Sequence, residues 1–542
     1  EWGVKFEDGR VSCPSAFKDA FRQYGEDGWT AAARDPEYGG QGFPHMMRIV
    51  INDMMYGACQ SFNMAPSLTH GAAHLIESFG ARELKERFVT KMFDGTWSGT
   101  MCLTEPDAGS NLAALETTAF PEGDYYRIKG SKIFISWGEH DLTENIVHLV
   151  LARIEGAPKG TKGISLFLVP KYRVNDDGSL GEFNDVVCTG IEHKMGINGN
   201  ATCSLTLGGK GQCIGTLLGE ENKGMRAMFL MMNEARLLVG MQGFCCASAS
   251  YLNAVNYARE RVQGKNLLQM MDPDAPGVPI IQHPDVRRML ISMKSYVEGM
   301  RSFTYFIADC LEQVDFGSEP SERKRCKGLV DLLTPVIKTY NAKYGFEVCV
   351  QAIQTYGGYG YIREYPLEQL LRDAKITSLY EGTDGIQAMD LLGRKIGMNK
   401  GAVFQDFMAE IGKVVARARQ IDELAPLADT MQQTLDRLAG AAMTIGMTAL
   451  SPDFKTAFAH SVPFLEVFGD VVMAWMLLWR AAVAAEKMAG KVKKKDLPFY
   501  RGQIKSAEFF FGTVLPVTQG KMAALEALCP AALEIDAAAF GG

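Results

Sequence analysis

The chain lacks the sequence signals of several common protein classes. It has 542 residues and a net charge of only −7, and it has no basic run long enough to form a nucleic-acid surface. Its 12 cysteines show no CxxC spacing, and its eight histidines do not cluster. This pattern argues against a disulfide framework or a zinc site. We therefore expect a protein of a reducing compartment that binds neither nucleic acid nor a metal ion.

Long apolar runs are also missing. The longest strongly apolar stretch is Val471–Trp479, which is closed by Asp470 and Arg480. A membrane-spanning helix needs roughly 20 such residues, so we expect a buried helix here and no membrane association. No secretory signal is visible, and the expected location is the bacterial cytoplasm. The chain starts at Glu1 without a methionine, which leaves the mitochondrial matrix open.

Common nucleotide-binding and hydrolase motifs are absent. The glycines of Tyr356–Tyr361 follow no suitable strand, and no acidic residue follows them at the ribose-binding distance. The sequence also contains no P-loop, no GxSxG elbow and no HExxH motif. A nicotinamide cofactor bound in the Rossmann manner is therefore not expected.

The hydrophobic periodicity changes along the chain and predicts several domains. Residues 1–98 show helical periodicity, with Leu84, Phe88, Val89 and Met92 on one face. Residues 99–217 contain short runs rich in β-branched and aromatic residues, separated by turn residues, as in an all-β domain. Residues 218–398 and 399–542 are again helical. The predicted layout is helical, β, helical, and an added helical domain.

Two stretches around the start of the β region could serve a cofactor. In Cys102–Leu112, "CLTEPDAGSNL", hydroxyl groups flank a turn whose backbone N–H groups could cradle a phosphate or a ring edge. A plain Asx turn is the alternative. In Lys132–Gly138, "KIFISWG", Phe134 and Ser136 share one face of a predicted strand, as a cofactor shelf or as ordinary packing.

A third stretch, "LYEGTDGIQ" (Leu379–Gln387), carries an acidic residue in front of a flexible turn. Glu381 directly precedes Gly382 and Thr383. The carboxylate could belong to a surface loop, or it could be a base directed at a substrate.

Taken together and in order, six stretches resemble the acyl-CoA dehydrogenase family. The resemblance covers roughly residues 30–398 and rests on "CLTEPDAGSNL", "GSKIFISWG", "EHKMGINGNATCSLTL", "YARERVQGK", "QTYGGYGYIREYPLEQLLRDAKI" and "LYEGTDGIQ". The added domain and the "RERVQGK" variant are similar to a longer bacterial subfamily that includes 3-methylmercaptopropionyl-CoA dehydrogenases.

The resemblance implies a multidomain α+β fold. It has an N-terminal helical domain (1–98), a central β-barrel or β-sandwich domain (99–217), a C-terminal four-helix bundle (218–398) and an additional helical domain (399–542). It also implies a flavoenzyme of fatty acid β-oxidation that oxidises an acyl-CoA to the trans-2-enoyl-CoA with FAD as cofactor. A homodimer or homotetramer with FAD near a subunit interface is expected.

By the same resemblance, the flavin contacts come from several motifs. The residues matched to cofactor positions are Met101, Leu103, Thr104, Gly109, Ser110, Phe134, Ser136, Arg261, Gln354 and Thr383. Arg261 and Gln354 match positions that complete the flavin site of the neighbouring subunit. The residues matched to substrate positions are Ser110, Arg236, Tyr380 and Gly382.

Glu381 matches the catalytic base of the family. The proton beside a thioester carbonyl is weakly acidic, and a carboxylate in a dry pocket has a pKa raised towards about 6 to 7, nearer to this task. Some family members carry the base immediately before the arginine matched by Arg236, where this chain has Ala235. Glu234 lies one step further back, about 100° around a helix, and is predicted to point elsewhere.

Two departures from the family pattern concern the flavin contacts. The stretch after Arg261 reads "VQGK" where members often have phenylalanine and glycine, so a second contact to the partner's flavin is open. Gly385 stands where many members have glutamine, so that side-chain contact is missing.

The expected electron acceptor is electron-transfer flavoprotein. The alternatives are an acyl-CoA oxidase that uses O₂, a non-redox acyl-CoA lyase of the desulfinase type, and a silent paralogue of the same fold. Glu381 argues against the lyase, since such enzymes lack that glutamate. The sequence leaves the substrate open between short- or medium-chain acyl-CoA and 3-methylmercaptopropionyl-CoA.

Overall fold

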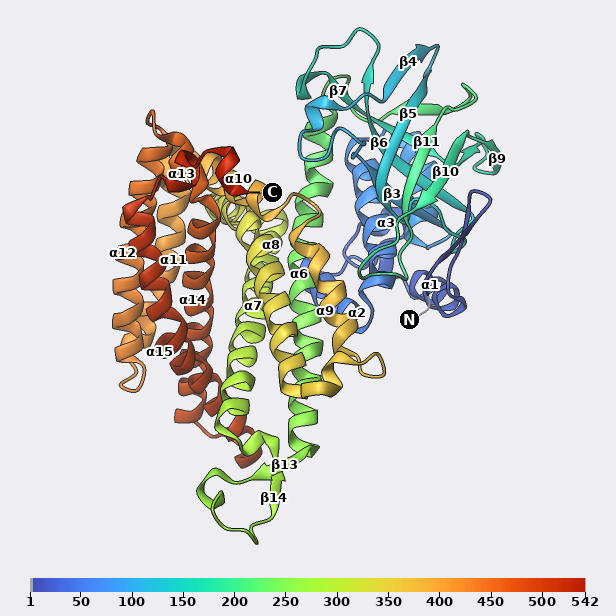
Figure 1. Cartoon of the computed structure of the whole chain (residues 1–542). Helices are drawn as coiled ribbons and strands as arrows, with labels where there is room; N and C mark the ends of the chain where they lie inside the picture. Colours follow the sequence, from blue (N-terminus) through green and yellow to red (C-terminus); the bar gives the residue numbers. More distant parts are fainter. Residues whose placement is uncertain (1–2, 542) are drawn as a thin grey trace. The chain divides into compact units, whose positions relative to one another are not determined.

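The structure, a computed structural model, describes residues 3–541. The chain divides into two compact units, residues 1–238 and 239–542, which are described separately. Helix α6 (Gly224–Glu260) begins in the first unit and ends in the second. The colours of Figure 1 follow the chain through both units.

The first unit starts with a β-hairpin that the periodicity did not predict. β1 (Lys5–Glu7) pairs antiparallel with β2 (Arg10–Ser12). The turn residues Asp8 and Gly9 both have positive φ, 49° and 77°. This Asp-Gly turn matches the right-handed twist of the paired strands and is a strong hairpin signal.

Helices then follow, as predicted for residues 1–98. They are α1 (Ser15–Glu26), η1 (Trp29–Ala31), η2 (Pro36–Tyr38), α2 (His45–Ala58), α3 (Gln60–Phe79), α4 (Arg82–Leu84), the π-helix η3 (Lys85–Val89) and α5 (Thr90–Phe93). Phe88, Val89 and Met92 are buried and Leu84 is half-buried, which confirms the predicted apolar face.

The strands of residues 97–217 form one large sheet and one small separate pair. Their bounds are β3 (Trp97–Cys102), β4 (Thr118–Glu122), β5 (Tyr125–Ser136), β6 (Asn145–Ile154), β7 (Ile164–Pro170), β8 (Tyr172–Val174), β9 (Leu180–Phe183), β10 (Val186–Ile191), β11 (Thr202–Leu207) and β12 (Ile214–Leu217), with short 3₁₀ turns η4 (Leu112–Ala114) and η5 (Thr161–Gly163). The large sheet runs β10-β11-β5-β12-β7-β6-β3, and β4 pairs with both β5 and β6. Strands β4, β5, β12, β7 and β6 therefore form a closed ring, which agrees with the predicted barrel-type domain.

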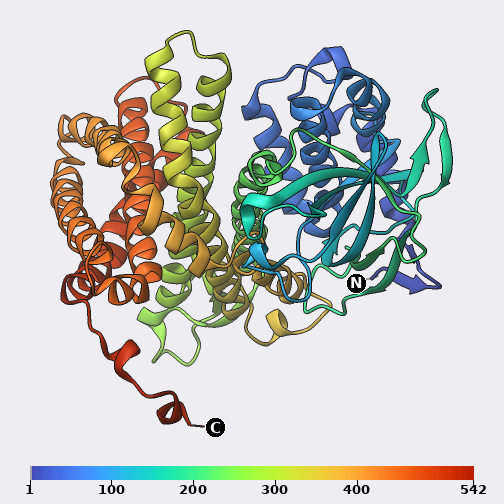
Figure 2. The same cartoon turned by 90° about the horizontal axis from the view of Figure 1, so that it is seen from above.

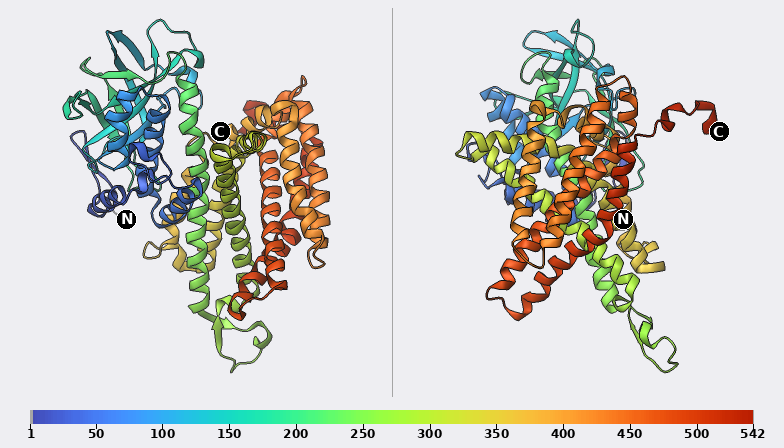
Figure 3. Two further views of the ribbon diagram at one scale, coloured as in Figure 1. Left: turned by 180° about the vertical axis from the view of Figure 1, so that it is seen from behind. Right: turned by 90° about the vertical axis from the view of Figure 1, so that its left-hand side faces the viewer.

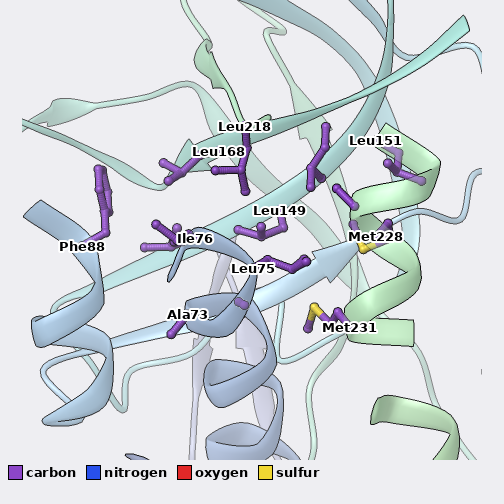
Figure 4. Close-up of a cluster of buried hydrophobic side chains, with 14 of the residues drawn as sticks. Ala73, Leu75, Ile76, Phe88, Leu149, Leu151, Leu168, Leu218, Met228 and Met231 are labelled. Carbon is purple, nitrogen blue, oxygen red and sulfur yellow. The ribbon is translucent and has the colours of Figure 1, made fainter. Parts of the chain in front are cut away.

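The core of the first unit joins the sheet to the helices. Leu75 and Ile76 on α3 pack with strand residues such as Leu149 and Leu168, and Met228 comes from the start of α6 (Figure 4). All of these side chains are buried. At roughly 25 cal/mol per Å² of apolar surface removed from water, such a cluster dominates the stability of the unit.

The second unit is almost entirely helical. Besides α6 it contains η6 (Leu267–Gln269), η7 (Ile280–Gln282), α7 (Pro284–Phe316), α8 (Pro320–Tyr356), η8 (Gly357–Tyr361), α9 (Leu367–Lys375), η9 (Ile376–Ser378), α10 (Asp384–Asp390), the π-helix η10 (Leu391–Lys395) and η11 (Met398–Gly401). The added helices are α11 (Ala402–Arg419), α12 (Ala425–Ala449), α13 (Phe454–Ala459), α14 (Ser461–Ala489), η12 (Lys494–Asp496), α15 (Leu497–Ala527), α16 (Ala531–Glu534) and η13 (Ala537–Phe540). A short hairpin, β13 (Val262–Lys265) with β14 (Gly277–Pro279), connects α6 to α7.

Helix α14 is the central helix of this unit. It packs against α7, α8, α11, α12 and α15, which lie side by side in Figures 1 and 2. Among residues 3–541 it is the one helix that is long and apolar enough to cross a membrane. An 18-residue stretch of it has a mean hydropathy of 1.6, and 83% of that stretch is buried. The buried helix predicted around Val471–Trp479 is thus confirmed, since an all-round apolar helix belongs in a core.

A buried polar network holds the added helices on α8. Asp470 of α14 accepts hydrogen bonds from the Tyr340 hydroxyl (2.7 Å), the Thr518 hydroxyl (2.9 Å) and the Lys521 ammonium (3.0 Å). Asp470 is fully buried, and burial raises the pKa of its carboxyl although Lys521 opposes the shift. These partners satisfy a charge that would otherwise destabilise the core.

Two segments of the second unit leave the helix bundle. The β13–β14 connection lies beyond the end of α7 (Figure 1), and residues after α15 lead away from the bundle (Figures 2 and 3). The predicted boundaries at 98, 217 and 398 stay predictions, whereas the predicted order of helical, β and helical regions is what the structure shows.

Candidate functional site

The stretch Cys102–Leu112 forms a tight turn after β3. Glu105 and Ala108 exchange two backbone hydrogen bonds, 3.2 and 3.1 Å, around Pro106 and Asp107. The Glu105 carboxylate points inward and accepts from the backbone N–H groups of Glu116 (2.6 Å) and Thr117 (3.1 Å). The turn predicted for "PDAG" is therefore present, and its glutamate fixes the segment that follows.

A buried lysine ties this turn to β5. Lys132 has no solvent exposure, and its Nζ donates to Leu103 O (3.0 Å), Leu151 O (2.8 Å) and Glu105 Oε1 (2.7 Å). Burial lowers the pKa of Lys132, although Glu105 opposes this. Burial also raises the pKa of Glu105, but Lys132 and the two N–H donors outweigh it and keep the pKa below its usual value. A buried pair needs this many partners, since each ion is costly to desolvate.

The two predicted cofactor motifs lie side by side. Ile133 N donates to Thr104 O at 3.0 Å. In each stretch the preceding residues, Lys132 and Leu103, are also hydrogen-bonded to each other. The side chain of Leu103 is buried in the core, whereas Met101 and Thr104 are half-buried. The structure thus brings the first motif and the β5 motif to one place within the first unit.

A β-bulge in β5 changes the direction of Phe134. The ladder with β11 pairs Cys203 with Ile135 and Leu205 with Lys132, so Ile133 and Phe134 face a single residue. Phe134 has φ +58°, a left-handed conformation that costs a non-glycine residue about 1–2 kcal/mol. The residue is nevertheless 57% exposed. Bulges next to binding sites re-aim side chains, and strained residues cluster at such sites.

Ser136 and Trp137 follow the bulge at the end of β5. Ser136 is half-buried and pairs with Thr202 of β11. Trp137 also has a positive φ, 56°, and its buried indole donates to Ser61 O at 3.2 Å. Phe134 and Ser136 are both more exposed than Ile135 and Trp137, so an aromatic face and a hydroxyl are presented together.

Gly109 and Ser110 are exposed at the end of the turn. A hollow of about 430 Å³ next to this turn is lined by Glu105, Asp107, Glu116, Phe120 and Lys129 among others. The two cofactor motifs therefore present exposed backbone and side chains that a ligand can reach.

In the second unit, Glu381 lies in a strained two-residue turn. Glu381 has φ +57° and Gly382 has φ +87°, directly before α10. Thr383 caps the helix, and its hydroxyl accepts from Ile386 N at 3.4 Å. The flanking Tyr380 hydroxyl donates to the Gln242 amide oxygen of α6. A non-glycine residue adopts this conformation only where its surroundings over-determine it.

An ion pair between a buried lysine and a half-buried aspartate lies close to the same turn in the sequence. Asp384, in the first turn of α10, lies 3.6 Å from Lys338 Nζ of α8. Burial raises the pKa of Asp384, and the lysine opposes that rise. Gly385 carries no side chain here, so the contact expected from glutamine in many family members stays absent.

Arg261 and the Gly357–Tyr361 turn meet on another surface of this unit. The Arg261 guanidinium lies 5.4 Å from the ring centroid of Tyr359. Gln354 is exposed at the end of α8, three residues before the turn begins, and its backbone oxygen accepts from Gly357 N. The structure therefore brings Arg261 close to the segment that Gln354 precedes, while Val262 beside it is exposed.

Glu234 is held by two arginines and a histidine in the first unit. His74 Nδ1 lies 2.6 Å from Glu234 Oε1, Arg48 Nη2 lies 3.2 Å from Oε2, and Arg34 Nη2 lies 3.9 Å away. Burial raises the pKa of Glu234, but Arg48, His74 and Arg34 overcome this and hold the pKa well below its usual value. A base for a weakly acidic proton needs a raised pKa, so this geometry disfavours the rival base. Arg236, two residues further on, is buried.

Sequence reasoning missed several side chains that build these places. The ion pair of Lys132 with Glu105, and the cations around Glu234, join residues far apart in the chain. The amide of Gln387, which donates to Glu381 O at 3.0 Å, is visible only as the last letter of the quoted motif. No local pattern distinguishes these residues from ordinary polar positions.

Family models of acyl-CoA dehydrogenases match almost the whole chain. The N-terminal domain model matches residues 7–96, the middle domain residues 100–209 and the C-terminal domain residues 222–396. A further model, described as acetyl-CoA dehydrogenase C-terminal like, matches residues 407–536.

Relatives of similar length share more than a third of their residues with this chain. It is 38% identical to 3-methylmercaptopropionyl-CoA dehydrogenase of Ruegeria pomeroyi, over 95% of this chain and 86% of the relative. It is also 38% identical to a butyryl-CoA dehydrogenase of Syntrophomonas wolfei, over 99% and 89% of the two chains. The broad-specificity linear acyl-CoA dehydrogenase FadE5 of Mycobacterium tuberculosis is 37% identical, over 98% and 88%.

Solved structures share the fold, including the added helices. The Caenorhabditis elegans protein ACDH-11 in complex with C11-CoA has a TM-score of 0.76 at 18% identity and covers 94% of this chain and 82% of its own. An acyl-CoA dehydrogenase of Bacillus anthracis complexed with FAD has a TM-score of 0.73 at 21% identity, with 96% and 84% covered. The predicted fold is confirmed, and the predicted FAD is confirmed as the cofactor of the family. The chain belongs to the acyl-CoA dehydrogenase family, the family of flavoprotein oxidoreductases that its motifs predicted.

Proposed function

We propose that this protein oxidises a saturated acyl-CoA thioester to the trans-2-enoyl-CoA, with FAD as cofactor and Glu381 as the base. The observation that carries the proposal is the conformation of Glu381. A surface glutamate has no need of a left-handed backbone with anchored neighbours, and such strain persists where a function depends on it.

The chemistry assigned to Glu381 is removal of the proton next to the thioester carbonyl. Its carboxylate takes that proton while the neighbouring carbon loses a hydride, so a C=C bond forms between the two carbons. The negative charge that develops on the thioester oxygen needs hydrogen-bond donors, and the Glu381 backbone N–H is the donor that the family resemblance assigns. Gly382 lets the backbone turn tightly at this point, beside the proposed position of the ligand.

The residues of the first unit fit a flavin. Phe134 offers an exposed aromatic face, Ser136 offers a hydroxyl, and Thr104 offers a hydroxyl and a backbone N–H beside them. Leu103 would act through its backbone, because its side chain is buried. Bound FAD would supply the two-electron oxidant that accepts the hydride. Met101, Gly109, Ser110 and Thr383 complete the set of residues proposed to hold it.

Further residues are proposed to act between subunits and on the substrate. Arg261 and Gln354 would complete the flavin site of a neighbouring subunit, which requires a homodimer or homotetramer. The proposed acyl-CoA contacts are Ser110, Arg236, Tyr380 and Gly382.

The relatives narrow the substrate class. Their names specify 3-methylmercaptopropionyl-CoA, butyryl-CoA and linear acyl-CoAs. We infer a short- or medium-chain acyl-CoA, or 3-methylmercaptopropionyl-CoA, as substrate. Electron-transfer flavoprotein is the proposed acceptor, supported by a solved structure titled for that flavoprotein of Acidaminococcus fermentans, whose matching chain is 26% identical.

An anaerobic titration tests the proposal. The purified flavoprotein is titrated with butyryl-CoA, octanoyl-CoA, palmitoyl-CoA and 3-methylmercaptopropionyl-CoA while the flavin absorbance near 450 nm is followed. Bleaching by the shorter acyl-CoAs or by 3-methylmercaptopropionyl-CoA supports it. Absence of bleaching by every member of the panel, with flavin present, contradicts it. Rapid O₂ consumption with substrate would instead identify an oxidase.

A further inference from the structure

The backbone that carries Glu381 is held by a buried glutamine. Gln387, one turn into α10 (Asp384–Asp390), has no solvent exposure, and its Nε2 donates to Glu381 O at 3.0 Å. The bond reaches back over the strained turn from the helix that follows it. Because Glu381 is the proposed base, the inference below rests on the proposed function.

This hydrogen bond acts where the backbone is least stable by itself. A left-handed conformation costs Glu381 about 1–2 kcal/mol, and Gly382 beside it has no Cβ to restrict its rotation. The orientation of the Glu381 carbonyl and the direction of its Cα–Cβ bond are both set by the same few backbone torsions. A donor that fixes the carbonyl therefore also fixes the Cα–Cβ bond from which the carboxylate extends.

Gln387 is itself rigidly placed. Its backbone N–H donates to Thr383 O at 3.0 Å, so it belongs to the first turn of a helix that Thr383 caps. A Cβ at Gly382 would lie only 2.7 Å from Gln387 Nε2. The glycine after the glutamate is thus required by the buried amide as well as by its own positive φ of 87°.

A second glutamine anchors the other side of the turn. The Tyr380 hydroxyl donates to Gln242 Oε1, and Gln242 is buried in α6. Glu381 consequently lies between two residues, Tyr380 and Gly382, whose surroundings are set by buried amides. With the backbone held on both sides, the direction of the Glu381 side chain depends on its own side-chain torsions.

We propose that Gln387 is a positioning residue for the catalytic base: its amide holds the Glu381 carbonyl, and so aims the Glu381 carboxylate at the α-proton of the acyl-CoA. A glutamine meets this requirement because it combines the length to reach back with a neutral donor. Methionine has similar length and no donor. Glutamate would place a second carboxylate against the carbonyl oxygen.

The test compares Gln387→Met and Gln387→Glu with the wild type, each as the flavin-loaded full chain. Gln503→Met is the matched control, since Gln503 is a buried glutamine of the same unit that accepts a hydrogen bond from Arg480 and does not contact the turn. The rate constant of anaerobic flavin reduction by butyryl-CoA or 3-methylmercaptopropionyl-CoA is measured as a function of pH. Hydrogen–deuterium exchange of residues 379–386 is followed in the substrate-free proteins.

For Gln387→Met we expect reduction slowed about 10- to 100-fold, because a misplacement near 1 Å can cost that much. The substrate concentration for half-maximal rate stays within about threefold, since positioning acts on the transition state. Residues 379–386 exchange faster. Gln387→Glu moves the pH profile to higher pH, because a nearby like charge raises the pKa of a carboxylic acid. Gln503→Met lowers thermal stability and leaves rate, profile and exchange of this segment unchanged.

A reduction rate in Gln387→Met within about twofold of the wild type would overturn the proposal. Equal slowing in Gln503→Met would also overturn it, because the effect would then be general destabilisation. If no acyl-CoA reduces the wild type, the proposed function fails and with it the aim of the carboxylate. The exchange data then decide separately whether Gln387 holds the turn.

Discussion

Replacing Lys132 with methionine should destabilise the first unit more than almost any other single change of its size. The side chain keeps its length and loses its charge. In the native protein the Nζ donates to three oxygens, those of Leu103, Leu151 and Glu105, at 2.7 to 3.0 Å. The substitution leaves all three without this donor in a site with no access to water.

The expected loss of stability follows from the Glu105 carboxylate, which remains buried after the substitution. Breaking a buried ion pair by removing one partner typically costs about 3–5 kcal/mol, because the other charge stays buried and uncompensated. Two N–H groups still donate to Glu105, so we expect a value near the lower end, about 3 kcal/mol. Adding Glu105→Gln removes the stranded charge and should restore about 1–2 kcal/mol.

The assay is urea unfolding followed by tryptophan fluorescence, since Trp97 and Trp137 are buried in the first unit. Lys129→Met is the control, because Lys129 lies on the same strand and is exposed, and it should change stability by less than about 0.5 kcal/mol. Equal unfolding midpoints for Lys132→Met and Lys129→Met would refute the reasoning. So would a double variant less stable than Lys132→Met alone.

Two further predictions concern Glu234 and Gly382. Glu234→Gln should leave flavin reduction by acyl-CoA within about threefold of the wild type, yet lower the stability of the first unit by about 3 kcal/mol at neutral pH, because it strands Arg48. The pKa of Glu234 is depressed in the folded state, so its contribution to stability is present above the pKa of the unfolded chain and is lost as the pH falls through the folded pKa. The unfolding free energies of wild type and variant should therefore converge in acid. A difference that stays constant with pH would contradict this. Gly382→Ala should slow flavin reduction about 10-fold or more while the protein stays folded, because the new Cβ meets Gln387 Nε2 at 2.7 Å and the residue keeps a positive φ. Wild-type reduction kinetics in this variant would argue against the role given to the turn.

The secondary structure was predictable from the sequence where the local sequence of a segment determines it. The change from helical to alternating periodicity near residue 99 marks a real change, since β3 begins at Trp97. The hairpin at Lys5–Ser12 could also have been predicted from its Asp8–Gly9 turn, but its strands are only three residues each. Such short strands leave almost no periodic signal.

The face of a helix was harder to predict than its existence. The helical periodicity of residues 403–418 predicts one face of α11 with Phe404, Phe407, Met408, Ile411 and Val415. Phe407, Ile411 and Val415 are buried as predicted, but Phe404 and Met408 are only half-buried. The fully buried positions include Val403, Phe407 and Val414. Neighbouring apolar residues compete for the same core, and the packing of α14 and α12 decides between them.

For the candidate site, the sequence motifs indicate the proposed residues but not the geometry that holds them. A motif names Glu381 and Phe134, but the left-handed backbone of each depends on contacts made elsewhere in the fold. The bulge beside Phe134 is a property of the ladder between β5 and β11, which local sequence does not encode. Lys132 acts through contacts to residues distant in the chain, and Gln387 bonds back across a turn whose conformation the motif alone does not fix.

The assignment of the base is the central claim, and one comparison tests it most directly. The anaerobic rate of flavin reduction by the preferred acyl-CoA is measured for the wild type, Glu381→Gln and Glu234→Gln, each with its flavin content matched. The account predicts a loss of about 10²-fold or more for Glu381→Gln, as expected when a general base is removed, and near wild-type reduction for Glu234→Gln. Full reduction of Glu381→Gln together with loss of reduction in Glu234→Gln would contradict it and move the base to α6.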